Sequence, residues 1–183
     1  RLLLDHGASA REHFLSPQGE IESALYGAAG IANSAALTRL LLEAGADPND
    51  GEALYHAAEF STHGALQALL EAKPDSSWVS YCMCHKMDYE DPEGVALFLR
   101  HGADPSILLD RGVFAGSRPL HFAIYRRRGP QVLRLLLDAG ADPSLADKDG
   151  LTPARLAARL GQKETLGVFS TETLDDESRY LLA

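Results

Sequence analysis

The sequence has little cysteine and no long apolar run. Its two cysteines, Cys82 and Cys84, are separated by a single residue, a geometry that argues against a disulfide between them. Without a disulfide framework the chain is typical of a reducing compartment, and we expect a cytoplasmic protein. The longest apolar run is far shorter than the roughly 20 residues that cross a bilayer, so we expect no membrane association.

Positive charge is also scarce. Lys and Arg total 17 residues and Asp and Glu total 26, which gives a formal net charge of −9. Because a basic surface supplies most of the affinity for nucleic acids, this balance argues against a general nucleic-acid-binding protein. It is compatible with a basic protein partner. The basic run YRRRG (125–129) is interpreted either as a solvated turn or as a contact for an acidic partner peptide.

Motifs that carry catalysis or bind metals are missing too. Cys82, Cys84 and His85 lie together, but zinc takes four ligands, commonly from two separated pairs, and the sequence has no second cluster. The seven histidines are scattered, and the sequence offers neither a Ser-His-Asp group nor a glycine-rich phosphate loop. We therefore predict a protein that is not an enzyme and that has no catalytic residue, no metal and no cofactor.

What the sequence does contain is an internal repeat. An apolar triplet followed by Gly-Ala-Asp, or by close variants, occurs five times, at 2–9, 40–48, 68–75, 97–105 and 135–143. A second motif accompanies it, with anchor residues at Leu25, Leu54, Met83, Leu120 and Ala154. The first four anchors stand 19 or 20 residues before the next helix-breaking residue. A period of roughly 20 to 50 residues indicates a stack of similar units.

Each unit is predicted to be a helix, a turn, a second helix and a loop of variable length. Leu37, Leu40 and Leu41 recur at the spacing that places them on one face of a helix. Glycine ends this second helix in most units, whereas in one unit Lys73 takes the position of the glycine and Pro74 stops the helix. A single unit cannot bury its own apolar face, so the units must stack.

These motifs resemble the ankyrin repeat. The resemblance rests on RPLHFA (118–123), DKDGLTPARLAARLG (147–161) and the GAD or KPD helix ends. It implies an all-α ankyrin-repeat solenoid of stacked helix-turn-helix units with loop fingers over residues 1–170. Residues 171–183 are then an acidic tail or a truncated next helix. The resemblance also implies an inter-repeat hydrogen bond from His121, which occupies the histidine position of the Thr-Pro-Leu-His motif of that family.

Two further expectations follow from the register of the repeats. Residues 1–9 match only the second half of a repeat, so we expect a fragment of a longer array. His56 and His85 each lie two residues after an anchor, so we expect them to stack on neighbouring repeats.

The resemblance also predicts a binding surface. In ankyrin repeats, partners usually lie in a concave groove lined by the loop fingers and by the exposed ends of the first helices. The positions five and six residues after each anchor line that groove, and Phe114 lies in the long finger 103–119. Each aromatic ring either faces the groove or folds down onto its neighbours. The predicted partner-binding residues are Glu59, Phe60, Asp88, Tyr89, Phe114, Tyr125, Arg126 and Arg159.

The function implied by the resemblance is non-catalytic. We expect a monomeric protein–protein interaction module, a scaffold or adaptor, that binds a partner protein through the concave groove and binds neither nucleic acid nor membrane. The alternative is a regulatory or substrate-recruiting domain of a larger enzyme.

Overall fold

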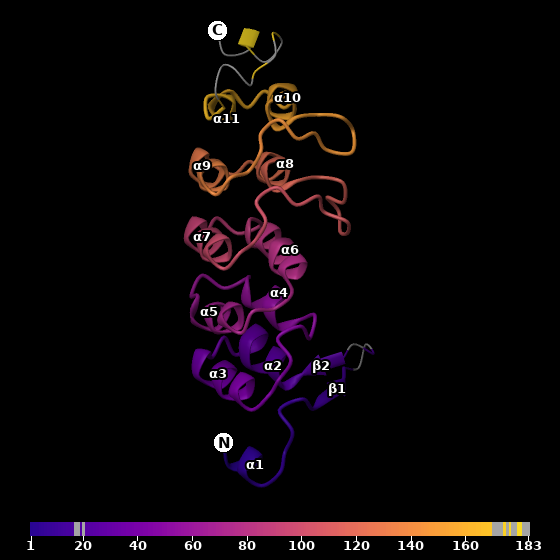
Figure 1. Ribbon diagram of the computed structural model, residues 1–183, viewed down its shortest axis with the longest axis vertical. Helices are drawn as coiled ribbons and strands as arrows, with labels where there is room; N and C mark the ends of the chain where they lie inside the picture. Colours follow the sequence, from indigo (N-terminus) through magenta and orange to yellow (C-terminus); the bar gives the residue numbers. More distant parts are fainter. Residues whose placement is uncertain (17–18, 20, 170–173, 175, 177–178, 181–183) are drawn as a thin grey trace.

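The helices stack in two columns along one long axis (Figure 1). The computed structural model describes residues 1–16, 19, 21–169, 174, 176 and 179–180. The inner column lies beside the projecting loops and contains α2 (Ala24–Tyr26) with its continuation η1 (Gly27–Ile31), α4 (Ala53–Ala57), α6 (Ser76–Lys86), α8 (Pro119–Tyr125) and α10 (Pro153–Arg159). The outer column contains α3 (Ala35–Glu43), α5 (Gly64–Glu71), α7 (Pro92–Arg100), α9 (Pro130–Asp138) and α11 (Lys163–Leu166). The predicted all-α stack of helix pairs is confirmed.

Three short elements precede the first helix pair. The helix α1 (Leu2–Asp5) is followed by β1 (His13–Leu15) and β2 (Ile21–Ser23), which pair antiparallel in the first finger. Among the residues that the structure describes, no helix is long and apolar enough to cross a membrane. The prediction of an acidic tail or truncated helix at 171–183 falls mostly outside the described residues.

Left-handed backbone ends the outer helices where the repeat motif places its helix breaker. The φ angles are 91°, 88° and 96° at Gly45, Gly102 and Gly140. The N–H of Ala46 closes one of these ends by donating to the Leu41 carbonyl over 2.9 Å. Lys73 adopts the same region with φ of 56°, which strains an L-residue by roughly 1–2 kcal/mol. Pro74 follows it and has no N–H, so that helix end cannot form the equivalent closing bond.

The helix α6 is longer than the other inner helices. It begins at Ser76, shortly after the end of α5, so the linker at this junction is helical and forms no finger. Its additional N-terminal turn brings Trp78 and Tyr81 onto the inner column.

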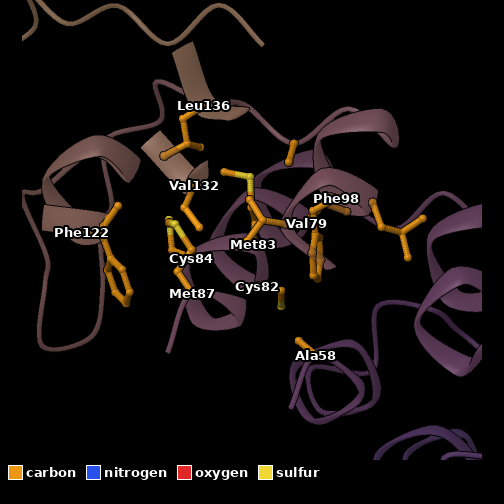
Figure 2. Close-up of a cluster of buried hydrophobic side chains, with 14 of the residues drawn as sticks. Ala58, Val79, Cys82, Met83, Cys84, Met87, Phe98, Phe122, Val132 and Leu136 are labelled. Carbon is orange, nitrogen blue, oxygen red and sulfur yellow. The ribbon is translucent and has the colours of Figure 1, made fainter. Parts of the chain in front are cut away.

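The core is continuous along the stack, and the middle of α6 lies within it (Figure 2). Cys82 and Cys84 are both buried. Figure 2 shows Cys82 on the side of Ala58 in the preceding repeat and Cys84 on the side of Phe122 in the following one. The motif CMCHK is therefore explained by packing on both neighbours, because small and flexible side chains allow close approach.

The predicted buried face of α3 is wrong for one residue. Leu41 is buried and Leu40 is half-buried, but Leu37 is 42% exposed. Thr38 is buried instead, and its hydroxyl donates to the Ser34 carbonyl over 2.8 Å, which satisfies the polar group. Adjacent residues lie about 100° apart around a helix, so Leu37 and Thr38 cannot both face the same neighbour. The side of α3 that packs against α5 and η1 buries Thr38 and leaves Leu37 exposed.

A charged group is buried at the junction between α6 and α7. The Lys86 ammonium lies 2.6 Å from Asp91 Oδ2 and donates to the Phe60 carbonyl over 2.7 Å. His63 Nε2 lies 2.6 Å from the same carboxylate oxygen, and Oδ1 accepts from the Gly94 N–H. Burial alone would raise the pKa of Asp91, but the hydrogen bonds from Lys86, His63 and Gly94 outweigh it and lower the pKa.

The histidine that was predicted to link repeats does so. His121 is buried, and its Nε2–H donates to the Leu151 carbonyl of the next repeat over 2.8 Å. Burial lowers the pKa of His121, so the imidazole is neutral at neutral pH.

Candidate partner-binding face

A pocket lies on the concave face between three inner helices and one finger. Tyr55 of α4, His85 of α6 and Arg126 of α8 line it on the helical side, and the finger closes it with Arg111 and Phe114. Its volume of about 70 Å³ is far below that of a site for a drug-sized ligand. A pocket of this size accepts a single side chain of a partner.

Stacked rings form the wall of this pocket. The His85 imidazole lies on the Tyr55 ring with 3.7 Å between centroids and an interplanar angle of 6°. Trp78 and Tyr81 stack on each other at 5.3 Å, and the Arg111 guanidinium lies 5.9 Å and 5.8 Å from their ring centroids. Burial raises the pKa of Tyr55 and Tyr81, which keeps both phenols neutral. The wall is therefore apolar on its faces and carries a cation at its edge.

Acidic side chains and histidines alternate across two adjacent repeats, those of α4 and α6. His56 lies between Glu52, at 3.2 Å, and Glu59, at 3.1 Å. His85 lies between Glu59, at 3.3 Å, and Asp88, at 3.2 Å. Carboxylates only accept hydrogen bonds, so each imidazole donates to both of its neighbours only when both ring nitrogens carry a proton. The expected stacking of His56 and His85 takes another form: both imidazoles contact Glu59, and His85 stacks on Tyr55.

The finger contributes one ring that packs against α8. The Phe114 ring lies 4.7 Å from the Phe122 ring and 5.4 Å from the Tyr125 ring. The Arg126 guanidinium lies 4.8 Å from the Phe114 ring, and its Nε is 2.5 Å from Asp88 Oδ1. Of the two orientations considered for Phe114, the structure has the ring tucked under the finger and half-buried, at the edge of the pocket.

Neither thiol is available for chemistry. Burial raises the pKa of Cys82 and Cys84 well above the usual value for a thiol, so both stay protonated at neutral pH. The thiolate is the nucleophile and the metal ligand, and it is disfavoured here. Within the part of the chain that the structure describes, no group of three His, Cys, Asp or Glu side chains is arranged to hold a metal ion.

Comparison with known proteins agrees with this architecture. A family model described as "Ankyrin repeats (many copies)" matches residues 103–157. The ankyrin repeat domain of Bcl-3, a member of the IkappaB protein family, is similar over 91% of this chain and 74% of its own, with a TM-score of 0.70 and 26% sequence identity. This chain is an ankyrin-repeat protein.

Two sequence relatives differ in how much of their length they share with this ankyrin-repeat protein. An ankyrin repeat protein of fowlpox virus (strain NVSL) is 29% identical over 119 residues, which are 63% of this chain and 80% of the viral protein. An L-asparaginase of Dirofilaria immitis is 33% identical over 97 residues, which are 53% of this chain and 15% of the asparaginase. The chain thus aligns with only a small part of that enzyme.

The ankyrin stack brings most of the predicted binding residues together. Three of them line the pocket itself: Asp88, Phe114 and Arg126. Three more touch its lining: Glu59 and Tyr89 through His85, and Tyr125 through Phe114. Tyr89 and Tyr125 remain 38% and 37% exposed. Of the remaining two, half-buried Phe60 accepts a bond from Lys86 through its carbonyl, and Arg159 lies exposed at the end of α10.

Several residues of the pocket were missed by sequence reasoning. Tyr81 lines the pocket and Trp78 stacks on it; both belong to the part of α6 that replaces a finger, and Arg111 reaches them from a different repeat. One sequence signal was present: tyrosine replaces histidine at Tyr55, in the slot of the Thr-Pro-Leu-His motif. A larger ring at that slot faces the groove and provides the surface on which His85 stacks.

The arginines of the basic run 125–129 have separate roles. Arg126 pairs with Asp88, and Arg128 donates to Glu90 over 3.1 Å and to the Asp88 carbonyl over 3.2 Å. Arg127 is exposed and has a left-handed φ of 53°. Two of the three arginines therefore bridge adjacent repeats, and the run is more than a solvated turn.

Proposed function

We propose that this ankyrin array binds a protein partner through the concave face formed by α4, α6, α8 and the finger 103–119. Ankyrin repeats are generally protein–protein interaction modules. The observation that carries the proposal is the pocket between Tyr55, His85 and Arg126, which has the size of one side chain and stacked rings in its wall. Exposed aromatic rings and arginines are the residues that anchor interfaces.

Two of the aromatic residues predicted to lie on the concave face supply the test. Phe60→Ala and Tyr89→Ala remove apolar surface from this face, and each should weaken capture of the partner in a pull-down from native lysate while circular dichroism stays unchanged. Leu37→Ala is the matched control, because Leu37 is similarly exposed but lies on α3 in the outer column. Normal capture by both ring variants, or equal loss in the control, would refute the assignment of the concave face.

A second candidate is a regulatory or substrate-recruiting domain of a larger enzyme. The observation in its favour is that the similar stretch of the D. immitis L-asparaginase makes up 15% of that protein. Ankyrin-like sequence therefore occurs within an enzyme. Sequencing the complete reading frame tests this candidate, since a catalytic domain in the same frame would support it and a frame without one would oppose it.

The compartment that fits this function is a reducing one, and we place the protein in the cytoplasm as a monomeric scaffold or adaptor. Both cysteines are buried in α6 and neither forms a disulfide. Free thiols of this kind are typical of a protein from a reducing compartment. Fractionation of the native cells, together with size-exclusion chromatography, tests the location and the oligomeric state.

A further inference from the structure

The charge of the inner helices changes sign along the stack. The segments 53–63 and 76–91, which contain α4 and α6, carry the acidic residues Glu59, Asp88, Glu90 and Asp91, with Lys86 as the one Lys or Arg. Lys86 is buried against Asp91 and presents no charge to the surface. The segments 119–129 and 153–163, which contain α8 and α10, carry no Asp or Glu, and their basic residues are Arg126, Arg127, Arg128, Arg155, Arg159 and Lys163. The inner helices are therefore acidic over two repeats and basic over the next two, while Arg111 of the finger adds a cation beside α6.

Two ion pairs lie at the boundary between the halves. Asp88 pairs with Arg126 at 2.5 Å, and Glu90 pairs with Arg128 at 3.1 Å. The charges nearest the boundary thus partly neutralise each other. Farther out, Glu52 has 46% and Glu59 has 33% of its side chain exposed on the acidic half, and Arg159 is exposed on the basic half. These outer charges are exposed to a partner, although Glu52 and Glu59 also contact His56.

The pocket lies at the same boundary, and its finger presents apolar side chains. The apolar lining residues of the finger are Leu109, Val113 and Phe114, and Val113 is 94% exposed. Rings of α4, α6 and α8 lie opposite, so an aliphatic side chain that enters here meets apolar surface from both sides, with Asp88, Arg111 and Arg126 also in the lining. Burying such a side chain contributes most of the affinity, while the flanking charges select its neighbours.

We propose that the concave face takes an extended peptide segment whose charges are segregated. Cationic residues lie over α4 and α6, one aliphatic side chain fills the pocket, and anionic residues lie over α8 and α10. This inference rests on the proposed function and specifies the chemistry of the partner. Helices pack about 8–10 Å apart and an extended chain advances about 3.3 Å per residue. The charged residues therefore lie roughly three to six positions on either side of the aliphatic residue.

Labelled peptides of about 13 residues test the order of the charges. In the first peptide, lysines precede a central leucine and glutamates follow it. In the second, glutamates precede the leucine and lysines follow it. A third has the same composition with lysine and glutamate interleaved. By fluorescence anisotropy with the intact chain, at least one segregated peptide should bind about fivefold tighter than the interleaved one or better. The difference should shrink at high salt, and replacing the central leucine by serine should abolish binding.

A charge reversal in the protein tests which residues distinguish the peptides. Arg159→Glu places an acid at the basic end of the face and should reduce the preference for the segregated peptide about threefold or more. Arg134→Glu is the matched control, because Arg134 is equally exposed but lies on α9 in the outer column. It changes the net charge by the same amount and should leave the preference unchanged.

Several results would overturn the inference: equal binding of segregated and interleaved peptides, tighter binding of an all-lysine peptide, no binding of any peptide, or equal effects of the two reversals. The proposed function fails separately. If no charge order is distinguished but Phe60→Ala and Tyr89→Ala still weaken capture of the partner, the concave face remains the binding site and only the proposed chemistry of the partner is refuted. If the segregated peptide binds tighter but both ring variants capture the partner normally, the peptide site is supported and the proposed function is refuted.

Discussion

The ammonium of Lys86 lies 2.6 Å from the carboxylate of Asp91, and the lysine side chain has no exposed surface. Removing one member of a buried ion pair leaves the other charge without its partner. Lys86→Met should therefore lower the free energy of unfolding by about 3 kcal/mol or more, as measured by urea denaturation. Lys163→Met, at an exposed lysine of α11, is the control and should change stability by less than about 0.5 kcal/mol. A mild effect at Lys86 would mean that the pair is not needed for folding.

A single glycine makes room for this lysine. A methyl group on Gly94 would lie 2.1 Å from Lys86 Cε, and the buried side chain has nowhere to move. Gly94→Ala should cost about 2 kcal/mol or more in thermal or urea unfolding. Gly129→Ala, where nothing lies within 4 Å of the added methyl group, should be close to neutral. In a Lys86→Ala background the penalty at Gly94 should disappear, and persistence of the penalty would identify a different clash.

The strained end of α5 offers a stabilising substitution. Lys73 has a φ of 56°, in the region that Gly45, Gly102 and Gly140 occupy at equivalent helix ends. Lys73→Gly should raise the free energy of unfolding by about 0.5–1 kcal/mol, because relief of strain exceeds the extra entropy of glycine in the unfolded chain. Gly102→Ala is the converse change and should destabilise by about 1 kcal/mol. A fall in melting temperature for Lys73→Gly would contradict this account.

The buried His121 predicts a dependence of stability on pH. Its folded-state pKa lies below the usual value because burial disfavours the imidazolium. The unfolded chain therefore takes up a proton first as the pH falls through about 6.5. The stabilising contribution of His121 is complete above that pH and is lost below it. The stability advantage of the wild type over His121→Gln should shrink between about pH 7.5 and pH 5, measured by urea unfolding at each pH. An advantage that stays constant or grows would contradict the prediction.

The sequence predicts the stack well because the signals are local. Helix breakers, anchor spacing and the position of His121 each depend on residues within one repeat, and they determine the helix pairs, the left-handed caps and the inter-repeat hydrogen bond. The buried face of α3 does not follow from the sequence alone, since Leu37 and Thr38 are adjacent and only the neighbouring helices decide which one is buried.

The pocket is harder to predict because its contacts cross repeats. The stacking of Tyr55 on His85 and the reach of Arg111 to Trp78 join residues that are 30 or more positions apart. The sequence before α6 carries no clear signal that this linker is helical rather than a finger. The register nevertheless identified Asp88, Arg126 and Phe114, which line the pocket, because positions equivalent in the repeat lie in a row along the stack.

The pocket on the concave face is lined by α4, α6, α8 and one finger, so three successive repeats contribute to it. Repeat proteins change length by gaining or losing whole repeats, and each repeat contacts only its neighbours. Deleting any one of these three repeats, or exchanging it for a consensus copy, would remove a wall and leave a stack that still folds. Binding specificity in this molecule is therefore a property of three consecutive repeats. Recombination must transfer all three together to carry that specificity to another array.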